Sequence, residues 1–237
     1  MNQGTEPHSM KIQIWYDLDG AKGAIGLTVI IDVFRAFSTA CYVFNNGAEK
    51  IIPTGDVMTA YSIKKANPDY VLIGEQHGEV PIGFDFGNSP SQIERVSFSG
   101  KTVIHTTTKG TKGIANARNA DEIITGSFVN AGAIVNYIKS RNPAIVSLVC
   151  TGTENEHILD EDALCAKYIK NELLDKRNNF EDIVQHLRES AYARYFFDPE
   201  IKSHPEEDFH FCMQLDKFDF VLRVRRGKNG PAYLSRI

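Results

Sequence analysis

The chain has 237 residues, of which 42% are hydrophobic and 24% are charged, and its formal net charge is −4. This composition is typical of a globular protein long enough to bury a large core, as one large domain or two small ones. The acidic balance argues against general binding to nucleic acid, which usually requires a basic face. No apolar run approaches the roughly 18 residues of a membrane span. We therefore expect neither a nucleic acid nor a membrane as a partner.

The cysteines and the first residues indicate the compartment. Cys41, Cys150, Cys165 and Cys212 are scattered without Cys-x-x-Cys spacing. This favours reduced thiols in a cytoplasmic protein over a disulfide framework or a zinc site. Residues 1–9 contain no hydrophobic segment for export. We interpret them as a disordered leader or an expression remnant, with Met10 as the natural start.

Apolar runs and turn residues predict strands that alternate with helices. The expected strands cover residues 11–15, 27–31, 50–54, 70–73, 102–105, 122–124 and 145–150. The expected helices are one that stops at 45–47, then 56–67, a small-residue helix ending at 118, then 130–141 and 160–174. This order predicts a three-layer α/β fold, with a mostly parallel sheet, helices on both faces and right-handed crossovers.

The pattern changes after residue 178. Helices are expected at 180–191 and 208–215, and residues 219–225 alternate like an edge strand. We predict a single α/β domain over 10–237, in which 178–237 form either a cap on the same sheet or a small subdomain.

Residues 27–31 are an apolar or β-branched run that leads directly into Asp32, as expected for a strand buried on both faces. Arg35 follows three residues later. We hypothesise that this turn anchors a site for a cation and a phosphorylated anion. The alternative is an ion pair between Asp32 and Arg35 that only fastens the turn.

The other expected strands also end in hydroxyl, glycine or acidic residues. These ends are Thr54, Gly74 and Glu75, Thr106 to Thr108, Gly126 and Ser127, and Thr151 to Thr153. In open α/β sheets, ligands bind at this edge beside helix N-termini, which attract anions. Each turn alone is explained by ordinary turn and capping chemistry. Taken together, they favour an oxyanion site.

Several acids near strand ends or helix starts are suitable for magnesium, which prefers oxygen ligands. They are Asp32, Glu75, Asp85, Glu161 and Asp162. Capping of the following helix explains Asp160. The long loop at 76–90 is expected to be functional or disordered. Within it, His77 is a candidate general acid, whereas His204 is expected at an ordinary surface position.

Some phosphate-binding motifs are missing from the sequence. It contains no Gly-x-x-x-x-Gly-Lys-[Ser/Thr] loop and no Gly-x-Gly-x-x-Gly. Asp32 has no second Asp two residues later, and no cysteine is followed by arginine six residues on. These absences set aside several familiar classes of phosphate enzyme.

Six blocks match a known family in order. They are 31–36 (IDVFRA), 83–90 (GFDFGNSP), 106–111 (TTTKGT), 126–131 (GSFVNA), 149–153 (VCTGT) and 161–166 (EDALCA). With these blocks the chain resembles the 2-phosphosulfolactate phosphatase family. The resemblance implies an α/β fold of the family's own type. It also implies a magnesium-dependent phosphatase that hydrolyses 2-phospho-3-sulfolactate to 3-sulfolactate and phosphate, a step towards coenzyme M.

The chain departs from the family pattern at three places. Lys109 stands where the family usually has Asn, and Gln76-His77 where it has an Arg-Gly pair. A His-Gly-Arg segment of the family is Tyr192-Ala193-Arg194 here, so only Arg194 carries over. Because these positions surround the expected anion site, they bear on the substrate more than on the reaction class.

The resemblance and the pattern together imply roles for individual residues. The expected catalytic residues are Asp32, Arg35 and Asp162, and the expected Mg²⁺ ligands are Asp32, Glu75 and Asp162. The expected substrate-binding residues are Asn88, Ser89, Thr106, Thr107, Thr108, Lys109, Gly110, Thr111, Ser127 and Arg194. The partner is a small anionic substrate, and a homo-oligomer remains open. The alternative function is a non-catalytic binder or sensor of small sulfonates or phosphates.

Overall fold

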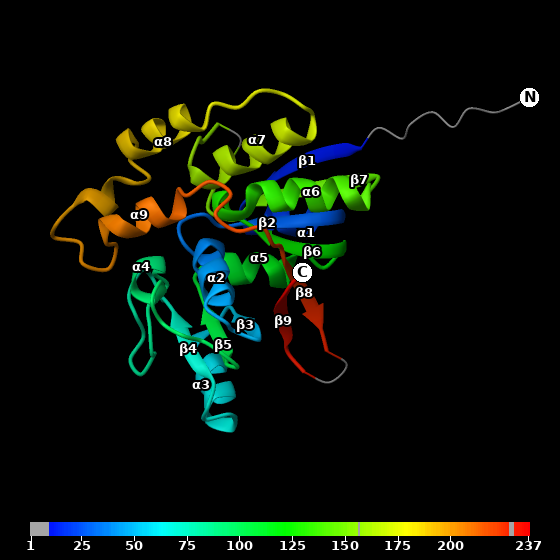
Figure 1. The fold of residues 1–237 in the computed structure, drawn as a ribbon. Coiled ribbons are helices and arrows are strands. Elements are labelled where there is room, and N and C mark those ends of the chain that lie inside the picture. Colours follow the sequence, from blue (N-terminus) through cyan, green and yellow to red (C-terminus); the bar gives the residue numbers. More distant parts are fainter. Residues whose placement is uncertain (1–9, 156, 228–229) are drawn as a thin grey trace, which may run out of the picture.

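A computed structural model describes residues 10–155, 157–227 and 230–237 (Figure 1). The interpretation of residues 1–9 lies outside this range. The described residues form a nine-stranded sheet in the order β1-β7-β2-β6-β8-β9-β3-β5-β4. No helix in the described part of the chain has the length and apolar character needed to cross a membrane.

The sheet contains two parallel blocks joined by an antiparallel hairpin. The first block consists of β1 (Lys11–Tyr16), β7 (Ile145–Cys150), β2 (Gly26–Ile31) and β6 (Ala120–Gly126). The second consists of β3 (Lys50–Thr54), β5 (Thr102–Thr106) and β4 (Val71–Gly74). Between them lie β8 (Leu222–Arg226) and β9 (Ala232–Arg236).

The hairpin reverses the direction of one block relative to the other. The pairings β6–β8, β8–β9 and β9–β3 are antiparallel, so in a flat sheet the two blocks would have their carboxyl ends on opposite edges. Yet a Cβ atom on Gly110, after β5, would lie only 2.6 Å from Oδ2 of Asp32, after β2. The sheet is therefore bent at the hairpin, and both blocks direct their carboxyl ends into one central region.

Helices cover both faces of the sheet, which confirms the three-layer α/β prediction. On one face lie α1 (Asp17–Gly23), α2 (Ala36–Asn45), α4 (Pro90–Ile93) and α5 (Gly110–Asn116). On the other lie α6 (Ala131–Arg141), α7 (Glu161–Leu173) and α8 (Phe180–Glu189). Helix α9 (Glu206–Cys212) packs into this second core and also contacts α2 and α4. Helix α3 (Val57–Ala66) packs on the second block. Strand β2 separates the two cores, because Ile30 packs into one and Val29 and Ile31 into the other.

The last strand region differs from its prediction. Residues 219–225 were expected at an edge, but β8 lies inside the sheet between β6 and β9. Its alternating arginines resemble an edge pattern because one face of the strand is polar. Arg223 pairs with Glu122 at 2.7 Å, and Arg225 donates to Ser235 at 3.3 Å. These two arginines therefore contact polar side chains on neighbouring strands instead of solvent.

Candidate active site

A cavity of about 630 Å³ lies where the carboxyl ends of the two blocks meet. Turns after β2, β4, β5 and β7 contribute to its walls, together with residues 191–204. The predicted site residues that line it are Asp32, Arg35, Glu75, Asn88, Thr107, Thr108, Lys109 and Asp162. Residues far apart in the sequence are thus brought together at one place.

Asp32 is buried directly after β2, at the point where its strand ends. Its Oδ1 atom accepts a hydrogen bond from the Ala36 N–H at 2.9 Å, which fixes the start of α2. Burial raises the pKa of Asp32 to about 6, the charge of Glu75 adds to this shift, and Lys109 opposes it. Because burial disfavours the charged form of Asp32, a nearby cation would stabilise its carboxylate.

Arg35 is bound to an acid that the sequence interpretation did not include. Its Nη1 atom donates to Oδ2 of Asp208 at 2.6 Å and to the Ser203 carbonyl at 3.0 Å. Both side chains of the Arg35–Asp208 pair are almost completely buried. Among the described residues Arg35 forms its ion pair with Asp208, so the alternative of an Asp32–Arg35 pair is wrong.

The start of α7 supplies three acids with different surroundings. Asp160 caps the helix, since its Oδ1 accepts from the Ala163 N–H at 3.0 Å, as expected. Asp162 accepts from the N–H groups of Val33 and Gly152, both at 2.9 Å, and thereby ties together two cavity turns. Glu161 also lines the cavity, and its own backbone N–H is the hydrogen-bond donor that lowers its pKa. Burial, followed by the charges of neighbouring acids, raises the pKa of both Glu161 and Asp162 well above the usual range.

Glu75 organises the two loops on the other side of the cavity. It accepts from the backbone N–H and the hydroxyl of Thr108, at 2.5 and 2.8 Å, and from the Gly78 N–H at 2.8 Å. The Lys109 ammonium donates to the Gly152 carbonyl at 3.2 Å. Glu75 and Lys109 therefore connect the turns after β4, β5 and β7.

The other hydroxyls of the turn after β5 are largely engaged with each other. Thr111 bonds to Thr107 through both its N–H and its hydroxyl, at 3.2 and 3.0 Å. The Thr106 and Thr54 hydroxyls lie 2.6 Å apart. Thr107 lines the cavity, whereas Thr106 and Thr111 are buried residues outside the described lining.

Four further predicted substrate-binding residues, Gly110, Ser89, Ser127 and Arg194, lie outside the described lining of this cavity, and their role stays a prediction. Ser89 lines a smaller neighbouring cavity of about 260 Å³ and donates to Asp208 at 2.9 Å. Ser127 is buried at the start of the 3-10 helix Phe128–Asn130, and its backbone N–H donates to Oδ1 of Asn130 at 3.2 Å. Arg194 is exposed on the 3-10 helix Arg194–Phe197.

Two histidines hold parts of the cavity wall. His105 is buried in β5, and its Nε2 lies 3.1 Å from Oδ1 of Asn88; burial lowers its pKa to about 3. The neutral ring is thus able to donate to the Asn88 oxygen and fix its amide. His204 lines the cavity, contrary to its expected surface position. It was missed because its placement depends on how residues 191–204 pack, and no motif adjoins His204 in the sequence.

The loop at 76–90 is partly ordered by packing away from the cavity. Phe84 packs against Tyr61, with ring centroids 5.8 Å apart. Oδ2 of Asp85 accepts from the Leu72 N–H at 2.8 Å and lies 3.8 Å from the Lys64 ammonium. Asp85, considered above as a magnesium ligand, therefore anchors the loop to β4 and lies outside the described lining.

The cavity is strongly acidic. Six acidic side chains line it, from Asp32, Glu75, Glu154, Asp160, Glu161 and Asp162, against the basic side chains of Arg35 and Lys109. In the described part of the chain, no three His, Cys, Asp or Glu side chains converge as a metal-binding group. The donor chemistry still fits Mg²⁺, which is commonly held by one or two carboxylates together with waters and substrate phosphates.

Buried acids beside a guanidinium and an ammonium, at the strand ends of an α/β sheet, define a candidate hydrolase site for an anionic substrate. A family model described as 2-phosphosulpholactate phosphatase matches residues 17–227, and the chain belongs to this family of phosphoric monoester hydrolases.

Similar proteins have the same description. The chain is 37% identical over 215 residues to a probable 2-phosphosulfolactate phosphatase of Thermotoga maritima, with 84% of this chain and 89% of the relative covered. It is 35% identical over 219 residues to the protein of that name from Caldicellulosiruptor saccharolyticus, covering 83% and 88%. The resemblance inferred from the six blocks is confirmed.

Proposed function

We propose that this protein is a magnesium-dependent phosphatase that hydrolyses 2-phospho-3-sulfolactate, or a closely related phosphorylated hydroxy-acid, to the hydroxy-acid and phosphate. The observation that carries this proposal is the match to the family over residues 17–227. All residues that line the acidic cavity lie within this span. The cavity therefore lies within the part of the chain that matches the family.

The charge of the cavity supports the metal requirement. The substrate carries phosphate, sulfonate and carboxylate groups, whereas most charged residues of the cavity are acids. Such an anion is repelled unless a cation balances the acids. Asp32 and Glu161 are the proposed principal ligands because they have few hydrogen bonds within the protein. Glu75 and Asp162 retain free lone pairs as further ligands.

In the proposed reaction, water adds to phosphorus and the bond from phosphorus to the hydroxy-acid oxygen breaks. This hydrolysis needs a barrier reduction on the order of 20 kcal/mol. Arg35 and Lys109 bind the oxyanions of the substrate, and His105 orients the Asn88 amide in the wall. Bound Mg²⁺ would supply several kcal/mol of charge stabilisation at the phosphoryl oxygens.

The test is a phosphate-release screen of small phosphorylated acids, including phosphosulfolactate and phospholactate, with Mg²⁺ and with excess chelator. We expect release only with the metal, and its loss in Asp32→Asn with an unchanged circular dichroism spectrum. Full activity in chelator would contradict the metal assignment. Turnover confined to substrates without sulfonate would change the substrate assignment. Tight binding of phosphosulfolactate without turnover would favour a binder or sensor.

A further inference from the structure

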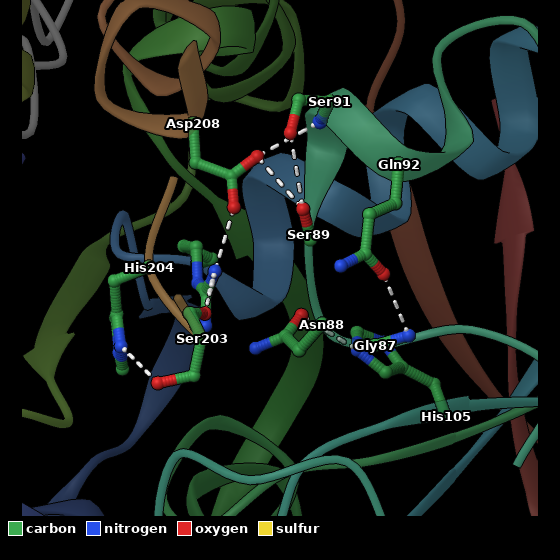
Figure 2. A network of polar contacts seen from close by, with 10 residues as sticks. Gly87, Asn88, Ser89, Ser91, Gln92, His105, Ser203, His204 and Asp208 are labelled. Atoms are coloured by element: carbon green, nitrogen blue, oxygen red, sulfur yellow. Dashed lines mark hydrogen bonds and ion pairs between the residues drawn. The ribbon is translucent and has the colours of Figure 1, made fainter. Parts of the chain in front are cut away.

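Asp208 of α9 is a fully buried acid that the proposed reaction does not use. Its Oδ2 accepts from Nη1 of Arg35 at 2.6 Å. Its Oδ1 accepts from the Ser89 hydroxyl at 2.9 Å and from the Ser91 N–H at 2.8 Å (Figure 2). One carboxylate thus joins α9 to the turn after β2 and to the start of α4.

These contacts hold the Arg35 guanidinium through one of its nitrogen atoms. Nη1 donates to both Asp208 and the Ser203 carbonyl, and Cζ lies 6.0 Å from the centre of the Phe196 ring. Within the described chain, the hydrogen bonds of this side chain are both at Nη1. Nε and Nη2 therefore remain as donors on a side chain that lines the cavity. Arginine binds phosphate through two such parallel N–H groups.

The same carboxylate also helps to fix the position of a second cavity residue, Asn88. Ser89 on one side is held by Asp208, and Gly87 on the other donates its N–H to Oε1 of Gln92 at 3.1 Å (Figure 2). Asn88 is therefore fixed between two anchored neighbours. Arg35 and Asn88 are two of the residues that line both the main cavity and the smaller one, and Asp208 helps to position both of them.

We propose that Asp208 is a positioning residue, which orients the guanidinium of Arg35 so that its Nε and Nη2 groups bind the phosphoryl oxygens of the substrate. The proposal rests on the proposed function, because that function places a phosphoryl group beside Arg35. A buried guanidinium without its carboxylate loses both its countercharge and its orientation. Displacement of a binding group by about 1 Å is enough to cost roughly 100-fold in rate.

The test is a cycle of Asp208→Asn, Arg35→Met and the double variant, with kcat and KM measured for each. Asn keeps an oxygen for Ser89 and Ser91 but removes the negative charge. We expect Asp208→Asn to lower kcat/KM by about 10- to 100-fold, mainly through kcat. In the Arg35→Met background it should cause no further loss, because Asp208 acts through Arg35.

Glu122→Gln is the matched control. Glu122 is a largely buried acid, paired with Arg223 at 2.7 Å, and it lines a different cavity. We expect its kcat/KM to equal that of the wild type. If Asp208→Asn fails to fold, Asp208→Glu keeps the charge but moves the guanidinium. For this variant we expect about a tenfold loss of kcat/KM.

Calorimetric binding of inorganic phosphate provides a readout that needs no turnover. We expect Asp208→Asn to weaken phosphate binding about tenfold when Arg35 is present, and not at all in the Arg35→Met background. If Asp208→Asn weakens phosphate binding equally with and without Arg35, or if Asp208→Glu has the wild-type kcat/KM, the positioning role is overturned and the proposed function is not. A wild type that neither releases nor binds phosphate would overturn the proposed function, and the positioning role with it.

Discussion

At the scale of single residues, burial decides what the polar groups of the cavity do. His105 is 1% exposed and neutral, so it orients Asn88 instead of carrying charge into a site with an arginine and a lysine. Asp208 is 0% exposed and lies 2.6 Å from the Arg35 guanidinium. The same physical condition, exclusion from water, makes the first group a neutral donor and the second a fixed countercharge.

The buried His105 predicts a specific acid sensitivity of the fold. Its pKa is lowered to about 3 in the folded state, whereas histidine in an unfolded chain has a pKa near 6.5. Below pH 6.5 the unfolded state binds more protons, so the free energy of unfolding should fall by roughly 1.4 kcal/mol per pH unit towards pH 3. The contribution of neutral His105 to the free energy of unfolding is fully present above pH 6.5.

The measurement is urea unfolding between pH 7 and 5, for the wild type and for His105→Gln. Gln retains a donor for Asn88 and does not titrate. The variant should lose less stability over this range than the wild type. Parallel curves for the two proteins would mean that His105 is protonated in the folded state.

The sequence revealed residues with local signals and missed those whose role depends on distant contacts. Asp32 follows a continuous apolar strand, and Glu75 follows another, so both could be predicted. Asp208 is 173 residues from Arg35 in the chain, and it lies in a short helix whose first turn is rich in acids. Nothing in that local pattern distinguishes a buried countercharge from a solvated surface acid.

At the scale of elements, α5 and the turn after β2 approach more closely than side chains usually permit. Gly110 begins α5, and a Cβ at this position would lie 2.6 Å from Oδ2 of Asp32 and 3.0 Å from Cβ of Ala36. Glycine therefore allows the two turns to meet. The backbone of Gly110 also forms a hydrogen bond that lowers the pKa of Asp32.

We expect Gly110→Ala to displace α5 from Asp32, with a loss of about 1–3 kcal/mol in unfolding free energy and a large loss of kcat. Gly230→Ala is the control, because a Cβ there would meet no atom of the described residues within 4 Å. Both variants are to be compared by thermal unfolding and phosphate release. Wild-type values for Gly110→Ala would show that the turns have room to separate.

The regular elements could be predicted because their apolar periodicity is strong. The expected strand at 50–54 and the helix at 56–67 agree with β3 and α3 to within a residue at each end. Helix α1 was missed because its seven residues, DLDGAKG, contain two glycines and little apolar pattern. Tertiary packing stabilises it instead: a Cβ on Gly23 would lie 2.8 Å from the Trp15 ring.

At the scale of the whole molecule, the β8–β9 hairpin connects the two parallel blocks of the sheet. Leu222 and Leu234 are buried residues of the hairpin, at 0% and 1% exposure. Leu234 pairs with Ile51 of the second block, and Leu222 with Thr125 of the first. The relative position of the two blocks, and with it the cavity, depends on these contacts.

We expect Leu234→Ala to lower the free energy of unfolding by about 2–5 kcal/mol, as for other buried leucines. Leu174→Ala, at a side chain that is 44% exposed, should cost much less. Chemical denaturation followed by circular dichroism measures both. Equal small losses would indicate that the hairpin is not part of the cooperative core.

The central place of the hairpin has a consequence for the order of events during synthesis. Residues 222–236 follow every other strand along the chain, yet they join the two blocks at the middle of the sheet. Because domains form as the ribosome releases them from the N-terminus, each block can acquire its parallel pairings before the hairpin emerges. Until then each block exposes an unpaired edge, which is prone to aggregation. A nascent chain stalled at residue 221 should therefore depend on chaperones and lack phosphate release.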